Sequence, residues 1–273
     1  MKVNIVSHTP NPEQLIAAAA NLCYSDMPID KLQEKLTPEK AATLNEKLLN
    51  MGHESPFEHI NFTFSIEGIS RVVSHQMVRH RVGCSYNQRS QRYINESEGN
   101  YVTPNLIQKD EIIENMYQEF IENAFENYDT VTQALTFNLI LEWSIDNWPE
   151  FYNLQENMEV EKAVQFFIDR QKKLYQQFKR RAQEEARYLL PNACATSLIV
   201  TMNARALFNF FKLRCCRRAQ DEINQLAWEM LRQVKNISPV IFRNAGAPCQ
   251  FGPCPEGEYS CGKPYRSKED GNK

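Results

Sequence analysis

The placement of glycine limits the fold of this chain more than any other feature. None of the nine glycines among its 273 residues lies between Tyr101 and Ala245. Within that stretch, residues 110–190 hold a single proline, Pro149, and many Glu, Gln, Lys and aromatic residues, a composition that favours helices. We therefore expect two or three long helices there, interrupted near Pro149.

Shorter patterns predict the other elements. Strands are expected at Met1–His8, at the alternating Ile60–Ile66 with Gly68 as its end, and at the β-branched Cys194–Met202. The remaining helices are expected at Asn11–Cys23, at Pro38–Met51 between the N-cap Thr37 and the stop Gly52, at Ile69–Arg81, at Asn203–Arg214 and at Ala219–Val234. The chain therefore combines helices and strands.

Positive charge gathers in residues 79–93, which contain four arginines and a histidine but no acidic residue. Guanidinium groups present rigid forks of donors that fit phosphate and carboxylate oxygens. Because the net charge of the whole chain is −3, a small anion fits this segment better than a nucleic acid. The sequence contains no Gly-x-Gly-x-x-Gly and no phosphate-loop pattern, so a bound nucleotide would be held by arginines instead.

The sequence shows no apolar run of membrane-spanning length and no signal peptide. We therefore expect a cytoplasmic protein without a membrane partner, whose eight cysteines are thiols or metal ligands rather than disulfides. Cys249, Cys254 and Cys261 lie in a Gly-, Pro- and Cys-rich tail, residues 246–273, but their spacing is irregular for a zinc ribbon. We expect free thiols there and no metal.

Three motifs in the sequence are similar to those of one known family. The first is Arg79-His80-Arg81, eight residues, then Ser90-Gln91-Arg92-Tyr93, where many members have seven residues in the gap. The second is the loop Gly52–His59, and the third is the helix Asn203–Arg214. With these motifs in this order, the chain resembles the flavin-dependent thymidylate synthases, and the resemblance spans Met1 to about Phe242.

The resemblance implies a mixed α/β (α+β) fold with a central mixed sheet, long flanking helices and a helical insertion at about residues 108–165. The synthase domain would span residues 1–245 and work as a homotetramer with active sites shared between protomers and no nucleic acid partner. The implied reaction is the methylation of dUMP to dTMP, with methylenetetrahydrofolate as carbon donor, FAD as hydride carrier and NADPH as reductant.

The resemblance also implies roles for individual residues. Arg214 and Ser90 would be catalytic, with Arg214 stabilising the ionised uracil ring, and Arg187 would hold the dUMP phosphate from a neighbouring protomer. The residues implied to bind FAD are Ser55, Arg79, His80, Arg81, Gln88, Asn203, Arg205 and Asn209. Those implied to bind dUMP are Gln76, Arg79, Gln88, Arg89, Ser90, Gln91, Arg92, Arg187 and Arg214.

Several alternatives stay open. The same arginines would suit a non-catalytic binder of nucleotides or single-stranded RNA. Cys84, beside arginines, would suit a methyltransferase that uses a thiolate nucleophile. His53 and His59 fit a structural role as well as a functional one. Asn209 and Arg214 lie roughly 140° apart around their helix, so one helix could serve two ligands.

Overall fold

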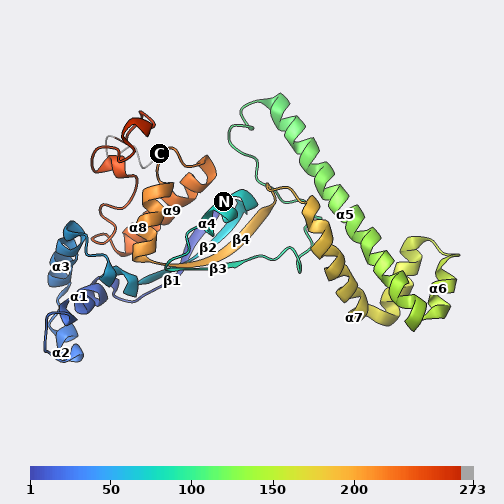
Figure 1. Cartoon of the computed structure of the whole chain (residues 1–273), viewed down its shortest axis with the longest axis horizontal. Coiled ribbons are helices and arrows are strands. Elements are labelled where there is room, and N and C mark those ends of the chain that lie inside the picture. Colours follow the sequence, from blue (N-terminus) through green and yellow to red (C-terminus); the bar gives the residue numbers. More distant parts are fainter. Residues whose placement is uncertain (266–273) are drawn as a thin grey trace. The chain divides into compact units, whose positions relative to one another are not determined.

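The structure is a computed structural model that describes residues 1–265, apart from the side chain of Gln33. Residues 266–273 of the expected tail lie outside this description. The chain divides into two compact units, one formed by residues 1–88 together with the chain from residue 196 onward, and the other by Arg89–Ala195. Figure 1 shows the elements of both units.

The first unit is built on a four-stranded sheet within the described residues, in the order β1-β2-β4-β3. β1 pairs antiparallel with β2, and β3 pairs antiparallel with β4. The Thr63–Thr201 hydroxyl contact and the hydrogen bond from Ala204 N to Ile60 O give β2 and β4 opposite directions. The mixed α+β class is confirmed, and the sheet itself is antiparallel rather than mixed. The strands are β1 (Lys2–His8), β2 (Asn61–Ser70), β3 (Cys84–Gln88) and β4 (Ala195–Asn203).

Local signals in the sequence fix the ends of several helices of this unit. The Thr37 side chain accepts a hydrogen bond from Lys40 N, and Gly52 adopts a left-handed conformation at φ 69°, so both predicted ends of α3 are confirmed. The helices and 3₁₀ turns of this unit are α1 (Pro12–Leu22), α2 (Ile29–Glu34), α3 (Pro38–Met51), η1 (Ser55–His59), α4 (Arg71–Met77), α8 (Ala204–Arg214), α9 (Asp221–Ile237), η3 (Pro248–Gln250) and η4 (Gly257–Tyr259).

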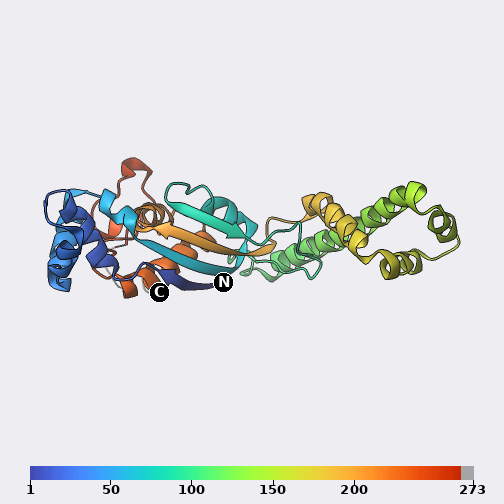
Figure 2. The same cartoon turned by 90° about the horizontal axis from the view of Figure 1, so that it is seen from below.

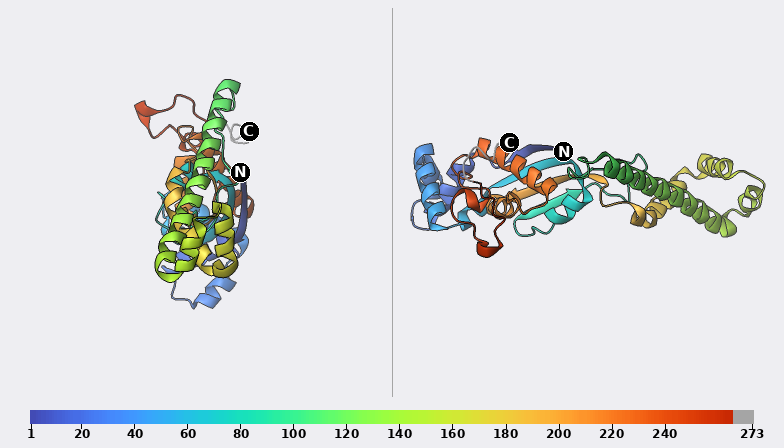
Figure 3. Two further views of the ribbon diagram at one scale, coloured as in Figure 1. Left: turned by 90° about the vertical axis from the view of Figure 1, so that its right-hand side faces the viewer. Right: turned by 90° about the horizontal axis from the view of Figure 1, so that it is seen from above.

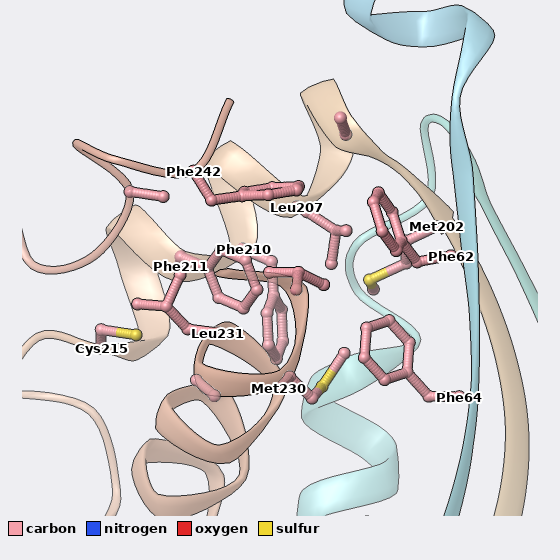
Figure 4. Packing of buried hydrophobic residues seen from close by; sticks show 14 of the residues in the cluster. Phe62, Phe64, Met202, Leu207, Phe210, Phe211, Cys215, Met230, Leu231 and Phe242 are labelled. Atoms are coloured by element: carbon pink, nitrogen blue, oxygen red, sulfur yellow. The ribbon is translucent and has the colours of Figure 1, made fainter. Parts of the chain in front are cut away.

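The main core lies between the sheet and the helices α8 and α9, which the views of Figure 1 and Figure 2 place against it. Figure 4 shows Phe62 and Phe64 pointing from β2 toward Phe210 and Met230, which come from the two helices. All four side chains are fully buried. Because interiors pack at nearly crystalline density, this core holds the ends of the strands and α8 in fixed register.

Two boundaries differ from the sequence prediction. Gly68 does not end β2, which continues to Ser70. Gly68 adopts a positive φ of 69° inside the strand, a conformation that glycine tolerates. The next helix begins only at Arg71, because the Ser70 side chain caps it by accepting from Val73 N at 3.2 Å. The predicted helix Ile69–Arg81 is therefore shortened to α4, and residues 78–83 form a connection to β3, a strand that the prediction missed.

The second unit is built around a helical hairpin, and the expectation of two or three long helices in residues 110–190 is confirmed. It contains α5 (Glu111–Asn147), α6 (Pro149–Gln155), α7 (Val160–Ala186) and η2 (Arg187–Leu189). α5 and α7 pack against each other (Figure 3). The expected interruption falls at Trp148, with Pro149 in the first turn of α6. None of the helices in the described part of the chain is both long and apolar enough to cross a bilayer.

Candidate active site

The first unit contains a cavity of about 550 Å³ where the three sequence motifs meet. One wall comes from η1, another from the connection between α4 and β3, and the third from the side of α8 that faces away from the core, from Asn203 to Arg214. The lining residues are Glu58, Arg79, His80, Arg81, Val82, Cys84, Asn203, Arg205, Ala206, Asn209, Leu213 and Arg214.

A close contact between Gly83 and Asn203 joins two of these walls. Gly83 has φ +69°, and a Cβ at this position would lie 2.5 Å from Nδ2 of Asn203. Asn203 N donates to Gly83 O at 2.9 Å, while the Asn203 side chain caps α8 by accepting from Ala206 N at 2.8 Å. Glycine is therefore required at position 83 both for its backbone angle and for the space that Asn203 occupies.

His80 is buried in the cavity wall and is held as a neutral acceptor. Arg214 Nε donates to His80 Nε2 at 3.1 Å, and the imidazole meets the Phe210 ring edge-on at 5.0 Å. Burial, and secondly the charge of Arg214, lower the pKa of His80 from 6.5 to about 4. The ring is therefore uncharged near neutral pH, with its proton on Nδ1, and it orients Arg214.

Arg214 is half-buried and carries a charge without a counter-ion. Its Nη1 donates to Gln76 Oε1 at 3.5 Å, and Gln76 Nε2 donates in turn to Gln220 Oε1 at 2.6 Å. Burial, and secondly the charge of Arg79, lower the pKa of Arg214. Within residues 1–265, no carboxylate lies within ion-pair distance of Arg214, so its remaining N–H groups are available to an anion.

The other arginines of the cavity fall into two classes. Arg79 and Arg81 are exposed and make no ion pair with any described carboxylate. Arg205 instead pairs with both Glu54 and Glu58, which raise the pKa of its guanidinium. Three arginine charges, those of Arg79, Arg81 and Arg214, are thus left for a ligand, and the cavity is a site for an anion.

Some predicted residues of this unit lie elsewhere. Ser55 begins η1 but does not line the cavity. Gln88 is half-buried in β3, where its Nε2 donates to Ser74 Oγ at 3.0 Å and to Thr196 Oγ1 at 3.3 Å. Asn209 and Arg214, whose different directions could let one helix serve two ligands, both border this cavity.

The predicted residues of the second unit make contacts within that unit. Arg92 pairs with Glu184 and lies 5.6 Å from the centre of the Tyr93 ring. Ser90 Oγ accepts from Arg92 N at 3.2 Å, and Gln91 Nε2 contacts Cys194 Sγ at 3.5 Å. Arg187 begins η2 and is half-buried, whereas Arg89 is exposed.

Sequence reasoning missed the support of this wall by β3. The Tyr86 hydroxyl lies 2.7 Å from His80 O and 2.9 Å from Met77 O, both of which it can serve as donor. Burial raises the pKa of Cys84, which also lines the cavity. Its thiol therefore stays protonated near neutral pH, which argues against the thiolate alternative.

The described residues contain no group of three or more His, Cys, Asp or Glu side chains arranged to hold a metal ion. No disulfide joins any two of the eight cysteines, all of which lie within residues 1–265, among them Cys249, Cys254 and Cys261. His53 and His59 are exposed at the ends of the loop that precedes β2, outside the lining of the cavity.

Comparison with known proteins agrees with the motifs. The sequence model of one family, described as "Thymidylate synthase complementing protein", matches residues 4–240. The flavin-dependent thymidylate synthase of Clostridium tetani is 40% identical over 269 residues, which cover 98% of this chain and 96% of the relative. The enzyme of the same name from Geobacter sulfurreducens is 40% identical over 265 residues, covering 96% and 94%.

A solved structure has a similar fold. It is the UMP/dUMP methylase PolB from Streptomyces cacaoi bound with 5-Br dUMP, which superposes with a TM-score of 0.58 at 20% sequence identity. The match covers 89% of this chain and 93% of that one. At this identity the likeness bears on the fold alone.

Proposed function

Because the chain belongs to the flavin-dependent thymidylate synthase family and is thus an enzyme, we propose that it methylates dUMP to dTMP with methylenetetrahydrofolate as carbon donor. The observation that carries this proposal is the cavity where the three motifs meet, with Arg79, Arg81 and Arg214 free of carboxylate partners in the described chain. A phosphate-bearing cofactor and a uracil anion are both ligands that such a site favours.

The residues of the cavity fit FAD. A volume of about 550 Å³ lies within the range of cofactor pockets. Arg79 and Arg81 offer charged donors to phosphate oxygens, and Asn209 offers amide groups that can serve a ribose or a ring edge. The residues that would hold FAD in the cavity are Arg79, His80, Arg81, Asn203, Arg205 and Asn209. When bound, FAD supplies the hydride of the reductive methylation, and NADPH is the reductant that we propose for it.

Arg214 stabilises the negative charge that develops on the uracil ring. His80 Nε2 and Gln76 Oε1 fix its guanidinium from one side, so the charge is already oriented before reaction. Since Arg214 is half-buried, its interaction with an anion is less screened than it would be in water. A neutral His80 can accept from Arg214 without adding a competing positive charge.

We further propose that dUMP is bound by Gln76, by Arg79 and by the segment from Gln88 to Arg92, with Ser90 at the reacting base. Arg92 already holds the Glu184 carboxylate, so an incoming phosphate would share or replace that partner. Arg187 is assigned to the dUMP phosphate of a neighbouring protomer. This assignment requires an oligomer, and we propose a homotetramer.

The same proposal gives the domain organisation. The synthase domain spans residues 1–245, and the helical insertion of about residues 108–165 coincides with α5, α6 and the start of α7. The tail begins at residue 246.

The test replaces Arg214 by Ala and measures dTMP formation from dUMP, methylenetetrahydrofolate, FAD and NADPH. Turnover should fall roughly a hundred- to a thousandfold, while the visible absorption of bound flavin is retained. Arg243→Ala is the matched control, because Arg243 is an exposed arginine of the same unit that pairs with Glu46, and it should keep wild-type turnover. Full activity in the Arg214→Ala protein would refute the role, and a wild-type protein that binds nucleotide but forms no dTMP would favour a non-catalytic binder.

A further inference from the structure

The segment that follows Arg214 has no regular structure of its own. Residues 215–220 join α8 to α9, and Arg217, Arg218 and Gln220 are exposed. Asn224 of α9 supports this segment, since its Nδ2 donates to Arg214 O at 2.7 Å and to Cys216 O at 3.0 Å. Asn224 N also donates to Gln220 O at 3.0 Å, so the backbone of the segment is tied to α9 at both of its ends.

The second half of the segment leads back to the cavity through Gln220. Gln220 Oε1 accepts from Gln76 Nε2 at 2.6 Å, and Gln76 Oε1 accepts from Arg214 Nη1 at 3.5 Å. Gln76 can present its oxygen to Arg214 only while its nitrogen faces Gln220, because the two atoms belong to one amide. The position of Gln220 therefore orients the guanidinium of Arg214.

The C-terminal tail contacts the middle of this segment, at Arg217 and Arg218. Tyr265 is buried, with 6% of its surface exposed, and its ring packs edge-on against Trp228 at 5.4 Å. The Arg217 guanidinium lies 3.9 Å above the same ring. The adjacent Arg218 donates to Tyr259 O at 2.7 Å. Two consecutive arginines of the segment are thus held by side-chain contacts with the tail.

Further contacts attach the tail to the rest of the first unit. Arg218 Nη1 lies 3.6 Å from a carboxylate oxygen of Glu256, and the Cys249 thiol accepts from Tyr265 N at 3.4 Å. We call residues 256–265 the tail clamp. They lie beyond residues 4–240, which the family's sequence model matches.

We propose that the tail clamp positions Arg214 for the reaction by fixing residues 215–220, with Tyr265, Arg217 and Gln220 as positioning residues. The inference rests on the proposed function, because it assigns to the clamp the support of a catalytic arginine. Displacement of a catalytic group by about 1 Å can reduce turnover roughly a hundredfold. Without the clamp, Arg217 and Arg218 lose these contacts, the segment moves more freely, and the Gln220 side chain no longer holds the Gln76 amide in place.

The experiment substitutes Tyr265 in the full-length protein and follows two readouts. In the wild-type protein, Cys215 N donates to Phe211 O and Ala219 N donates to Cys216 O, each at 2.9 Å. Tyr265→Ala should speed the hydrogen exchange of these two amides about tenfold or more. It should lower kcat about 10- to 100-fold and change the KM for dUMP less, since the interaction is strongest in the transition state. Tyr265→Phe keeps the ring and should restore most of both properties.

Tyr259→Ala is the matched control, because it removes a tyrosine side chain from the same clamp while its carbonyl, the group that Arg218 uses, remains. That side chain is 77% exposed, so exchange and kcat should both stay at wild-type values. If Tyr265→Ala fails to fold, Arg217→Ala cuts the same contact from the exposed segment and is measured instead.

The outcomes separate the two proposals. If wild-type protein forms dTMP and the clamp variant exchanges faster in residues 215–220 but keeps its kcat, the positioning role is refuted. Unchanged exchange in the variant refutes the clamp whatever the activity. If the wild-type protein forms no dTMP, the proposed function fails, and the clamp loses the role assigned to it even where exchange shows that it holds the segment.

Discussion

Replacing Gly83 by Ala tests how the cavity is assembled. Two costs follow from the structure. The first is backbone strain, because Ala must adopt φ +69°, at about 1–2 kcal/mol. The second is the loss of the cap on α8, because the new Cβ would lie 2.5 Å from the Asn203 side chain and displace it, at about 0.5–2 kcal/mol. The variant should therefore lose roughly 1.5–4 kcal/mol of stability.

Gly52→Ala separates the two costs. Gly52 has the same φ of +69°, but an added Cβ at this position would meet no atom within 4 Å. This control should show the strain alone, about 1–2 kcal/mol. Urea unfolding of both variants measures the difference, and titration with FAD measures its effect on the site. Gly83→Ala should bind FAD more weakly than Gly52→Ala, because only Gly83 touches the cavity wall.

A result in which the two variants lose equal stability and bind FAD equally well would refute this reasoning. It would mean that Asn203 moves aside without cost, and that the contact between the two motifs does not hold the cavity together.

Two further predictions concern side chains of the same wall. The pKa of His80 is lowered from 6.5 to about 4 in the folded chain. As the pH falls, the unfolded chain therefore takes up a proton before the folded chain does. At most ~3 kcal/mol of stability should be lost between pH 6.5 and 4. In urea unfolding measured against pH, His80→Gln should lack this loss, and an unchanged pH profile would contradict the assignment. Cys84→Ala should keep most of its dTMP formation, because partial burial raises the pKa of the thiol and keeps it protonated. A loss as large as that of Arg214→Ala would restore the thiolate mechanism.

Local patterns predicted the elements whose signals lie next to one another in the chain. The cap at Thr37 and the stop at Gly52 depend on neighbouring residues, and both ends of α3 are confirmed. The interruption at Pro149 is equally local, since proline lacks the donor that a helix interior needs.

Features that depend on distant partners escaped the prediction. β3 consists of the polar sequence Cys84–Gln88 and pairs with β4 at a sheet edge, so no apolar alternation marks it as a strand. The acid-free stretch around Arg92 concealed its pairing with Glu184, which comes from a distant helix. Arg205 is likewise paired with glutamates of another motif, and composition within a segment carries no information on such pairs.

The candidate site shows the same division. Arg79, His80 and Arg214, to which the motif resemblance assigns ligands, line one cavity, and their roles stay predictions. The network that orients them, from Gln220 through Gln76, joins residues that are far apart in the sequence. Only the fold places those amides in one chain of hydrogen bonds.

The most direct test of the central claim, that unpaired arginines make this cavity a flavin site, is a titration with FAD followed by the visible absorption of the flavin. The wild-type protein should bind FAD saturably, and NADPH should bleach the bound flavin. The double substitution of Arg79 and Arg81 by Gln should weaken binding at least about tenfold, because each charged hydrogen bond contributes roughly 1.5–3 kcal/mol. Equal FAD affinity in the wild-type and doubly substituted proteins would contradict the account.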